Sequence, residues 1–368
     1  GGNLKKGQTL FFFDEIQECP DILTALKFLV DEGSYRYVFS GSLLGVQMKD
    51  IRSIPVGYLY EKRMYPLDLG EFANALGMCE MTMSHIRDCY DRKSAVDDVV
   101  HEKMLELVNL YLVVGGMPEV VVKYLSTNNL HDVRFAQEGI VNLYKKDIAK
   151  YDVDNKLYIQ EIFDLIPSEL NAKNKRFILK SLNENAKYER YKNSFLWLAD
   201  AGVALPVYNV EEPKQPLRLN ELRNLFKLFL NDVGLLASCY PFELSLKIIM
   251  GEANMNFGAI YENLAAQELV AHGYSLHYFN SKRQGEIDFV VEHNGEVVPI
   301  EIKSGKDFKR HNALSNVLAT PDYDIKSAMV ISNANVSTFG RITYLPVYML
   351  MFFNPSVSSD TIVRFTPF

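Results

Sequence analysis

An Asn-Gly dipeptide at residues 294–295 lies between two apolar runs near the C-terminal end of the chain. This pattern is the strongest short-range signal for a β-hairpin with a two-residue turn. In such a hairpin His293 pairs with Glu296. Counting outward along both strands then places Asp288 opposite Glu301. Facing carboxylates destabilise a sheet by roughly 0.2–1 kcal/mol, so the sequence predicts a positive charge between them, with a hard divalent cation as the natural candidate.

Lys303 follows Glu301 by two residues, so both side chains project from the same face of the strand. An acidic pair that binds Mg²⁺ or Mn²⁺, beside a lysine that orients or deprotonates water, is suited to attack on a phosphodiester. The hairpin therefore predicts a metal site with hydrolytic chemistry.

A third acid, Glu262, precedes the hairpin on a predicted helix that runs towards Gly273-Tyr274. The order of this acid, Asp288 and Glu301-x-Lys303 resembles the PD-(D/E)xK nuclease superfamily, most closely its archaeal Holliday-junction-resolvase-like branch. The resemblance implies that Glu262, Asp288 and Glu301 bind the metal and that Lys303 takes part in catalysis.

Two alternatives stay open for this group of residues. Strand-edge acids and lysines are often only a solvated face, and some members of the superfamily keep the fold as a binding or scaffold module. Glu268, on the same predicted helix, is a second candidate for the helical acid.

Near the N-terminus, an apolar run at residues 9–13 ends in Asp14 and Glu15. Such a run predicts a buried parallel strand with acids at its carboxyl end. It resembles the Walker B element of AAA-type ATPases. The resemblance implies that Asp14 holds Mg²⁺ through water and that Glu15 polarises the attacking water.

A second short apolar run, at residues 37–42, ends in hydroxyl side chains. It resembles the sensor strand that lies beside Walker B, which implies Ser42 as the sensor. Arg63 and the following segment 65–72 resemble the arginine and "PLSF-EF" segment of a large prokaryotic group of AAA-type ATPases. Contact with a γ-phosphate and a structural salt bridge both remain open for Arg63.

The sequence contains no G-x-x-x-x-G-K-[ST] motif. A P-loop supplies most phosphate contacts, so we expect this chain alone to bind ATP weakly or not at all. Because the Walker B-like strand comes within the first fifteen residues and no methionine begins the chain, we expect an N-terminal truncation that removed the P-loop.

The combination of these ends with Gly115-Gly116-Met117-Pro118 and residues 231–236 resembles a widespread bacterial and archaeal AAA-type ATPase family whose C-terminal part is a domain of unknown function. The implied fold class is α/β. Its expected parts are a partial AAA-type P-loop ATPase core (1–95), a helical lid (96–155), a winged-helix-like domain (156–250) and a PD-(D/E)xK-like α/β nuclease domain (251–368).

Between the two ends the periodicity is mainly helical. The sequence predicts helices at 98–113, 118–126, 131–150, 157–166, 169–183 and 188–200, and strands at 203–209 and 225–230. The last three helices and the strands together suggest the winged helix. Basic side chains of this segment are candidates for phosphate contacts, namely Lys173, Lys175, Arg176 and Lys180.

The formal net charge of −7 argues against a protein coated in basic surface for nucleic acid. A local basic run, Lys303, Lys306, Lys309 and Arg310, lies beside the predicted metal site. The scattered cysteines indicate no disulfide scaffold or zinc site, and no stretch of ~18 apolar residues is long enough to cross a bilayer. We therefore expect a cytoplasmic protein without a membrane partner.

Two functional classes follow. In the first, an AAA-type ATPase is coupled to a nuclease-like domain that cuts nucleic acid, DNA in particular, with Mg²⁺ or Mn²⁺. In the second, the ATPase is a switch whose C-terminal module binds nucleic acid or a protein partner without cutting. A homo-oligomer is an expectation for the full-length form.

Overall fold

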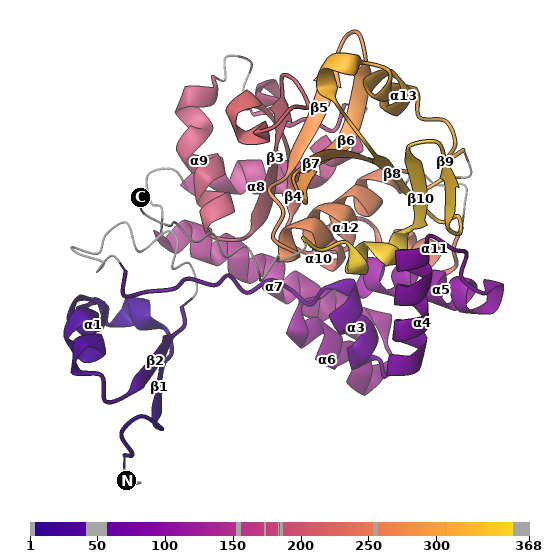
Figure 1. Ribbon diagram of the computed structural model, residues 1–368. Coiled ribbons are helices and arrows are strands. Elements are labelled where there is room, and N and C mark those ends of the chain that lie inside the picture. The colour runs from indigo at the N-terminus through magenta and orange to yellow at the C-terminus, as the bar shows by residue number, and fades with distance from the viewer. Residues whose placement is uncertain are drawn as a thin grey trace, which may run out of the picture.

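The computed structural model describes residues 4–41, 57–151, 156–172, 174–182, 184, 187–252, 257–305 and 307–355. Figure 1 shows their arrangement. The helices are α1 (Pro20–Glu32), α3 (Leu69–Ala75), α4 (Glu80–Arg92), α5 (Asp98–Val114), α6 (Pro118–Thr127), α7 (Leu130–Tyr151), α8 (Lys156–Asn171), α9 (Tyr188–Asp200), α10 (Val233–Ser238), α11 (Phe242–Ile249), α12 (Gly258–Ala271) and α13 (Asn312–Leu318). The strands are β1 (Leu10–Phe13), β2 (Arg36–Phe39), β3 (Ala204–Val210), β4 (Glu221–Leu230), β5 (His277–Ser281), β6 (Gly285–His293), β7 (Glu296–Ile302), β8 (Ala328–Ser332), β9 (Ser337–Phe339) and β10 (Ile342–Pro346).

The first two strands and α1 form a small N-terminal unit, drawn in indigo and set apart from the rest of the molecule in Figure 1. β1 and β2 are parallel, and Phe13 pairs with Phe39, which confirms the predicted neighbouring strands. The prediction that the first strand is buried was wrong, because Leu10 and Phe12 are 55% and 61% exposed. Among the described residues this sheet has two strands, and two strands alone leave a face uncovered.

Helices α3 to α7 form a block beneath the main sheet in Figure 1. The predicted helices at 98–113, 118–126 and 131–150 are confirmed as α5, α6 and α7. Asp97 begins α5 by accepting a hydrogen bond from the Val99 amide, and Pro118 at the first turn begins α6. No single described helix is long and apolar enough to cross a membrane, and α5 with α6 meets the length and composition only as a pair bent by 117°.

Two glycine-containing segments, residues 115–118 and 231–236, connect this helical block to the rest of the molecule. The Gly116 amide donates to the buried carboxylate of Asp232 at 2.6 Å. A Cβ on Gly116 would lie 2.0 Å from the Leu67 carbonyl oxygen, so only glycine fits this position. The same Asp232 carboxylate accepts from the Leu235 amide and begins α10. Both motifs therefore position helices relative to each other.

In the part of the chain that the structure describes, the main sheet has eight strands in the order β4-β3-β5-β6-β7-β8-β10-β9. β3 pairs antiparallel with β4 and parallel with β5. The strands predicted at 203–209 and 225–230 are thus confirmed as β3 and β4. They belong, however, to the same sheet as the strands after residue 250, so the expected boundary between a winged-helix-like domain and a nuclease-like domain falls inside one sheet.

The predicted helix at 169–183 was wrong for most of its length. α8 continues through Pro167 and ends at Asn171, and the described residues that follow are irregular apart from a 3-10 turn at Leu179–Ser181. The Glu169 carboxylate accepts hydrogen bonds from the Ile178 amide at 2.8 Å and the Ser181 hydroxyl at 2.7 Å. These side-chain contacts hold a loop where local propensity favours a helix.

Candidate functional site

The hairpin of β6 and β7 positions the predicted acidic site. His293 pairs with Glu296 in the predicted register. Asn294 and Gly295 have φ values of 51° and 83°, which are typical of a two-residue turn that favours Asn-Gly. Further along, the Ile302 amide donates to Asp288 Oδ2 at 2.8 Å. Asp288 is therefore fixed across the two strands, close to the end of β7.

Helix α12 brings Glu262 to the same place. The helix packs against β4 and β7, and the Glu262 side chain is almost completely buried. Its carboxylate is bound by two lysines, because Lys175 pairs with Oε1 and Lys227 Nζ lies 3.4 Å from Oε2. Lys175 was predicted to contact phosphates, but the structure turns it inward onto Glu262. Two other lysines of the predicted basic segments, Lys173 and Lys306, lie outside the described residues.

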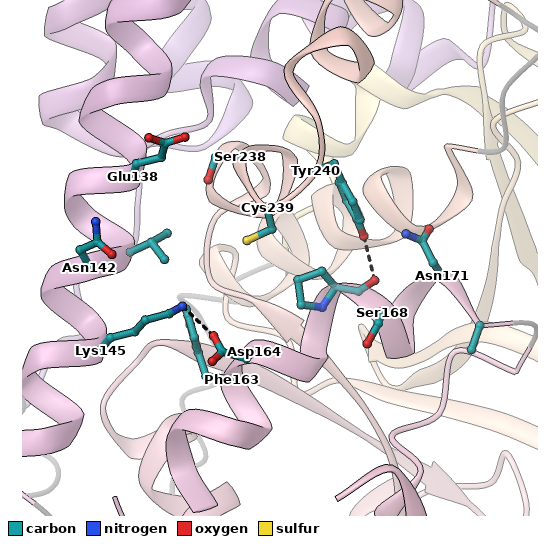
Figure 2. Close-up of a pocket in the computed structure, with 13 residues that line it drawn as sticks. Glu138, Asn142, Lys145, Phe163, Asp164, Ser168, Asn171, Ser238, Cys239 and Tyr240 are labelled. Atoms are coloured by element: carbon teal, nitrogen blue, oxygen red, sulfur yellow. Dashed lines mark hydrogen bonds and ion pairs between the residues drawn. The ribbon is translucent and has the colours of Figure 1, made fainter. Parts of the chain in front are cut away.

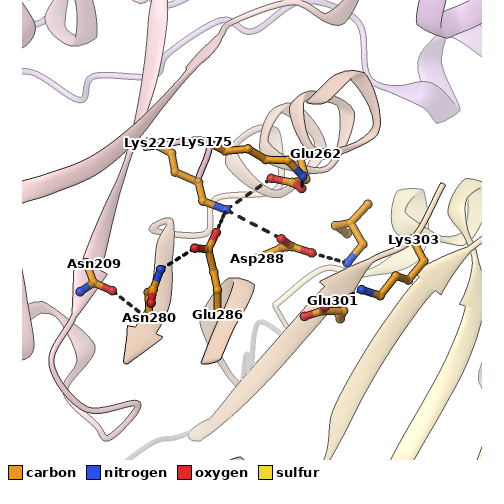
Figure 3. Close-up of polar contacts among 10 residues, drawn as sticks. Lys175, Asn209, Lys227, Glu262, Asn280, Glu286, Asp288, Glu301 and Lys303 are labelled. Atoms are coloured by element: carbon orange, nitrogen blue, oxygen red, sulfur yellow. Dashed lines mark hydrogen bonds and ion pairs between the residues drawn. The ribbon is translucent and has the colours of Figure 1, made fainter. Parts of the chain in front are cut away.

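Lys227 lies at the centre of this cluster (Figure 3). It comes from β4 and is completely buried. Its ammonium lies 2.9 Å from Glu286 Oε1 and 3.8 Å from Asp288 Oδ1, in addition to its contact with Glu262. A buried ammonium is stable only when carboxylates and hydrogen bonds replace its lost hydration. Three acids do so here.

Burial and the neighbouring charges together shift the pKa values of the lysine and the acids in this cluster. Burial acts to lower the pKa of Lys227, but Glu262, Asp288 and Glu286 together raise it above the ordinary value, so the ammonium stays charged. Burial acts to raise the pKa of Asp288, but Lys227 and Lys175 lower it below its usual range. Burial, together with Asp288, raises the pKa of Glu262.

Glu301 and Lys303 form the outer part of the cluster. Lys303 Nζ lies 2.7 Å from Glu301 Oε1. Burial raises the pKa of Glu301 to about 8; the neighbouring Asp288 adds to this effect, and Lys303 opposes it. Glu301 is therefore mainly protonated at neutral pH. Its Oε2 is buried and accepts no hydrogen bond from the described residues.

A divalent metal does not fit this arrangement. The four predicted residues, Glu262, Asp288, Glu301 and Lys303, do gather at one end of the hairpin, but Lys227 occupies the space between the first two acids. Within the described ranges, no group of three or more His, Cys, Asp or Glu side chains is arranged to hold a metal ion. The positive charge expected beside Asp288 and Glu301 is supplied by two lysines, Lys227 next to Asp288 and Lys303 next to Glu301.

Sequence reasoning missed Lys227 and Glu286 as members of the cluster. Lys227 is the single charged residue in the apolar run Leu225-Phe226-Lys227-Leu228-Phe229-Leu230. A lone lysine in such a run is rarely fully buried unless it is paired. This pattern could have identified it as the partner of an internal acid.

Glu268, the second candidate for the helical acid, has a different role. It is buried at the other end of α12, and its Oε1 accepts from the Leu69 amide at 2.8 Å. Leu69 begins α3, whose N-cap Asp68 lies 3.6 Å from His272. Burial raises the pKa of Glu268 to about 8. This residue anchors α3 and lies outside the acidic cluster.

The ATPase-like residues meet at the carboxyl ends of β1 and β2. The Ser40 hydroxyl donates to the Asp14 carboxylate, and the Ile16 amide donates to the Ser40 carbonyl at 3.0 Å. Glu15 has left-handed backbone angles, φ 51° and ψ 50°, which are strained for a residue other than glycine. Ser42 lies outside the described residues, and Ser40 is the hydroxyl that the structure places beside Asp14.

One cavity of about 630 Å³ contains Asp14, Glu15, Ser40 and Arg63. Its volume is in the range of about 300–1,000 Å³ that is typical of small-molecule sites. The structure therefore brings three predicted nucleotide-site residues together. Residues from later in the chain also line this cavity, namely Ala199–Gly202, Ala204–Pro206, Asn231, Val270 and Leu276.

A larger cavity, of about 870 Å³, lies between α7, α8 and the end of α10 (Figure 2). Two pairs of its lining residues contact each other, since Lys145 lies 2.7 Å from Asp164 and the Tyr240 hydroxyl donates to the Pro167 carbonyl at 2.9 Å. It holds none of the predicted site residues.

Family models match three parts of the chain. An AAA domain matches residues 2–73, a domain of unknown function (DUF8612) matches residues 105–245, and a second domain of unknown function (DUF4143) matches residues 257–350. No curated protein and no solved structure matches the chain. The three matches support an AAA-type ATPase in which two domains of unknown function follow the ATPase unit.

Proposed function

We propose that this chain is part of a nucleotide-dependent switch, in which an AAA-type ATPase unit controls a C-terminal α/β module that binds a partner without cutting it. The observation that carries this proposal is the position of Lys227. This fully buried lysine supplies, inside the protein, the positive charge that a nuclease of this type would take from a metal ion.

The ATPase half of the proposal rests on the AAA domain match and on the cavity that contains Asp14, Glu15 and Arg63. Mg²⁺ usually binds through one or two carboxylates together with substrate phosphates. Asp14, oriented by Ser40, would hold Mg²⁺ that arrives with ATP, and the ion would neutralise phosphate charge. Glu15 would orient the attacking water, and Arg63 would contact the γ-phosphate.

The module half rests on charge balance. The cluster contains four acids, Glu262, Glu286, Asp288 and Glu301, of which Glu301 is mainly protonated at neutral pH, and three lysines, Lys175, Lys227 and Lys303. A divalent cation would have to displace a buried ammonium and deprotonate Glu301. Removing one partner of a buried ion pair costs about 3–5 kcal/mol, which disfavours metal binding. Lys175 and Lys227 belong to the part that matches DUF8612 and the acids to the part that matches DUF4143, so the cluster also joins these two domains.

The alternative is metal-dependent hydrolysis of nucleic acid by the same module. Glu262, Asp288 and Glu301 would then bind Mg²⁺ or Mn²⁺, with Lys303 as the catalytic lysine. Their gathering at one end of the hairpin favours this alternative. It requires Lys227 to leave its position among the acids.

The deciding experiment is cleavage of labelled linear, single-stranded and four-way-junction DNA with Mg²⁺ or Mn²⁺. The chain is compared with its Asp288→Ala variant, and the same substrates are used to measure binding by fluorescence anisotropy. We expect no cleavage by either protein. Metal-dependent cleavage that disappears in the variant would establish the nuclease and reject the binding module.

Nucleic acid, DNA in particular, is the first partner to test. Lys309 and Arg310 are exposed, and Arg310 lines a small pocket together with Lys303, whereas Lys175 is paired with Glu262. Binding to phosphates through these residues should weaken as salt increases and should be lost in the Lys309→Glu, Arg310→Glu double variant. Absence of binding at low salt would leave a protein partner for the module.

A further inference from the structure

A third cavity, of about 510 Å³, is lined by residues of α5, α11 and α12 and of the segments that follow β7 and β8. Two of its lining residues, Tyr261 and Ser304, are the chain neighbours of Glu262 and Lys303 in the acidic cluster. The volume is within the range of about 300–1,000 Å³ that is typical of small-molecule sites. The cavity therefore begins next to the acidic cluster and contains none of its acids.

Three aromatic side chains line this cavity, namely Phe257, Tyr261 and Phe308. Phe257 and Tyr261 are buried at the start of α12. Phe308 is half-buried and packs edge-on against Tyr344, with 5.8 Å between the ring centroids. Proteins that bind single-stranded nucleic acid stack unpaired bases on aromatic side chains of this kind. Phe308 is thus a surface on which a flat ring can stack.

The cavity also holds a side-chain amide that is free to bind a ligand. Asn109 lies on α5, is half-buried, and its side chain has no hydrogen-bond partner in the part of the chain that the structure describes. Because both ends of this amide are free, it can donate and accept whichever way it is oriented. The edge of a nucleobase presents donors and acceptors, whereas an acyl chain presents neither. Glu252, which also lines the cavity, is exposed and places no buried charge there.

A smaller pocket, of about 240 Å³, adjoins this cavity, because Gly305 lines both. Lys303, Asp307 and Arg310 complete the smaller pocket, so its lining side chains carry two positive charges and one negative charge. Lys303 contacts Glu301, but an ammonium has three N–H donors. Lysine and arginine side chains bind phosphate through charge-assisted hydrogen bonds. The smaller pocket therefore suits a phosphate group.

We propose that these two pockets together bind one unpaired nucleotide of a single-stranded nucleic acid. The base lies in the larger cavity, stacked on Phe308 and hydrogen-bonded to Asn109. The phosphate lies in the smaller pocket, between Lys303 and Arg310. A base inside a duplex is paired and stacked, and it could enter the cavity only after it is flipped out of the helix. This inference rests on the proposed function, since it specifies the kind of nucleic acid that the module binds.

Fluorescence anisotropy tests the proposal with three labelled probes of equal length, about 20 nucleotides. The first is a single strand of thymidylate, the second is a fully paired duplex, and the third is an abasic strand that has the phosphates without the bases. All three are measured at one salt concentration, because binding to phosphates depends on salt. We expect the thymidylate strand to bind about tenfold or more tightly than either of the other probes, since only it presents unpaired bases.

A variant that fills the larger cavity locates the binding site. Ala334 lines this cavity and is half-buried, so Ala334→Phe should make the chain bind the thymidylate and abasic strands about equally. Ala172→Phe is the matched control, because Ala172 is a half-buried alanine of the cavity in Figure 2. It should leave the preference unchanged. Asn109→Leu, which keeps the size of the side chain and removes its amide, tests the same site if Ala334→Phe does not fold.

The three probes separate failure of this inference from failure of the proposed partner. Equal affinity of the unmodified chain for the thymidylate and abasic strands overturns the base pocket, while binding to nucleic acid still stands. A thymidylate preference that survives both Ala334→Phe and Asn109→Leu overturns this location for the base. If none of the probes binds at low salt, nucleic acid fails as the partner of the module, and the inference fails with it.

Discussion

Lys227 Nζ lies 3.8 Å from Asp288 Oδ1, with no part of the lysine exposed to solvent. The strand aspartate that resembles a nuclease metal ligand therefore faces an internal cation. Because the two residues lie in parts of the chain that match different domains of unknown function, their contact also ties those parts together.

Replacement of Lys227 by Met should destabilise the protein strongly. The change leaves Glu262, Glu286 and Asp288 without their shared cation, and breaking a buried ion pair in this way costs about 3–5 kcal/mol. Chemical denaturation measures the decrease in the free energy of unfolding. Lys145→Met, which removes an exposed partner of Asp164, is the control and should cost at most about 1 kcal/mol.

The same variant should gain an affinity for divalent metal. Without the ammonium, Mn²⁺ can approach the acids, so Mn²⁺ should raise the melting temperature of Lys227→Met and leave that of the unmodified chain unchanged. An equal rise in both proteins would mean that the lysine does not stand in for a metal.

The amide variants of Asp288 and Glu301 should behave differently from each other. The pKa of Glu301 is about 8, so Glu301→Gln resembles the protonated side chain and should be tolerated at pH 7. Asp288, whose pKa is lowered by Lys227 and Lys175, is charged, and Asp288→Asn should cost several kcal/mol. Unfolding measurements at pH 7 compare the free energies of unfolding of the two variants. An equal decrease in both would contradict the assigned protonation states.

Glu268 should make stability depend on pH. Its pKa is about 8 in the folded protein and near 4.5 in the unfolded chain, so stability should fall as pH rises between these values. The raised pKa of His272 acts in the same direction above pH 6.5, and the lowered pKa of Asp68 matters only in acid.

Thermal unfolding from pH 5 to pH 8 tests this prediction. Glu268→Gln keeps the acceptor for the Leu69 amide but does not ionise, so its melting temperature should fall less and exceed that of the unmodified chain at pH 8. Glu106→Gln, an exposed change, should follow the unmodified curve. Parallel curves for Glu268→Gln and the unmodified chain would reject a protonated Glu268.

Two glycine-to-alanine variants should have opposite effects. A Cβ at Gly116 meets the Leu67 carbonyl at 2.0 Å, so Gly116→Ala should destabilise by about 1–3 kcal/mol or more. Gly139 lies on α7, where an added Cβ would have no neighbouring atom within 4 Å, and Gly139→Ala should stabilise by about 0.5–1 kcal/mol. Chemical denaturation measures both changes. A neutral Gly116→Ala would mean that the motif does not set the packing of α5.

Much of the local structure could be predicted because short-range rules decide it. Asn294 and Gly295 adopt the backbone angles that their residue types favour, and the register from His293 and Glu296 follows. The prediction of a helix at 169–183 was wrong because the Glu169 carboxylate accepts hydrogen bonds from the Ile178 amide and the Ser181 hydroxyl. These side-chain bonds hold a loop against the local helical pattern.

The sequence by itself determined the β6–β7 hairpin and the helix that carries Glu262, since each depends on neighbouring residues and their periodicity, whereas the pairing of the first two strands was expected from a family resemblance. It also determined that the facing acids need a cation. Lys303 supplies the cation beside Glu301, whereas only the tertiary structure decided the cation beside Glu262, Glu286 and Asp288, because Lys227 is more than thirty positions from each of these three acids in sequence. Its ammonium reaches them through the packing of β4 and α12 in one fold.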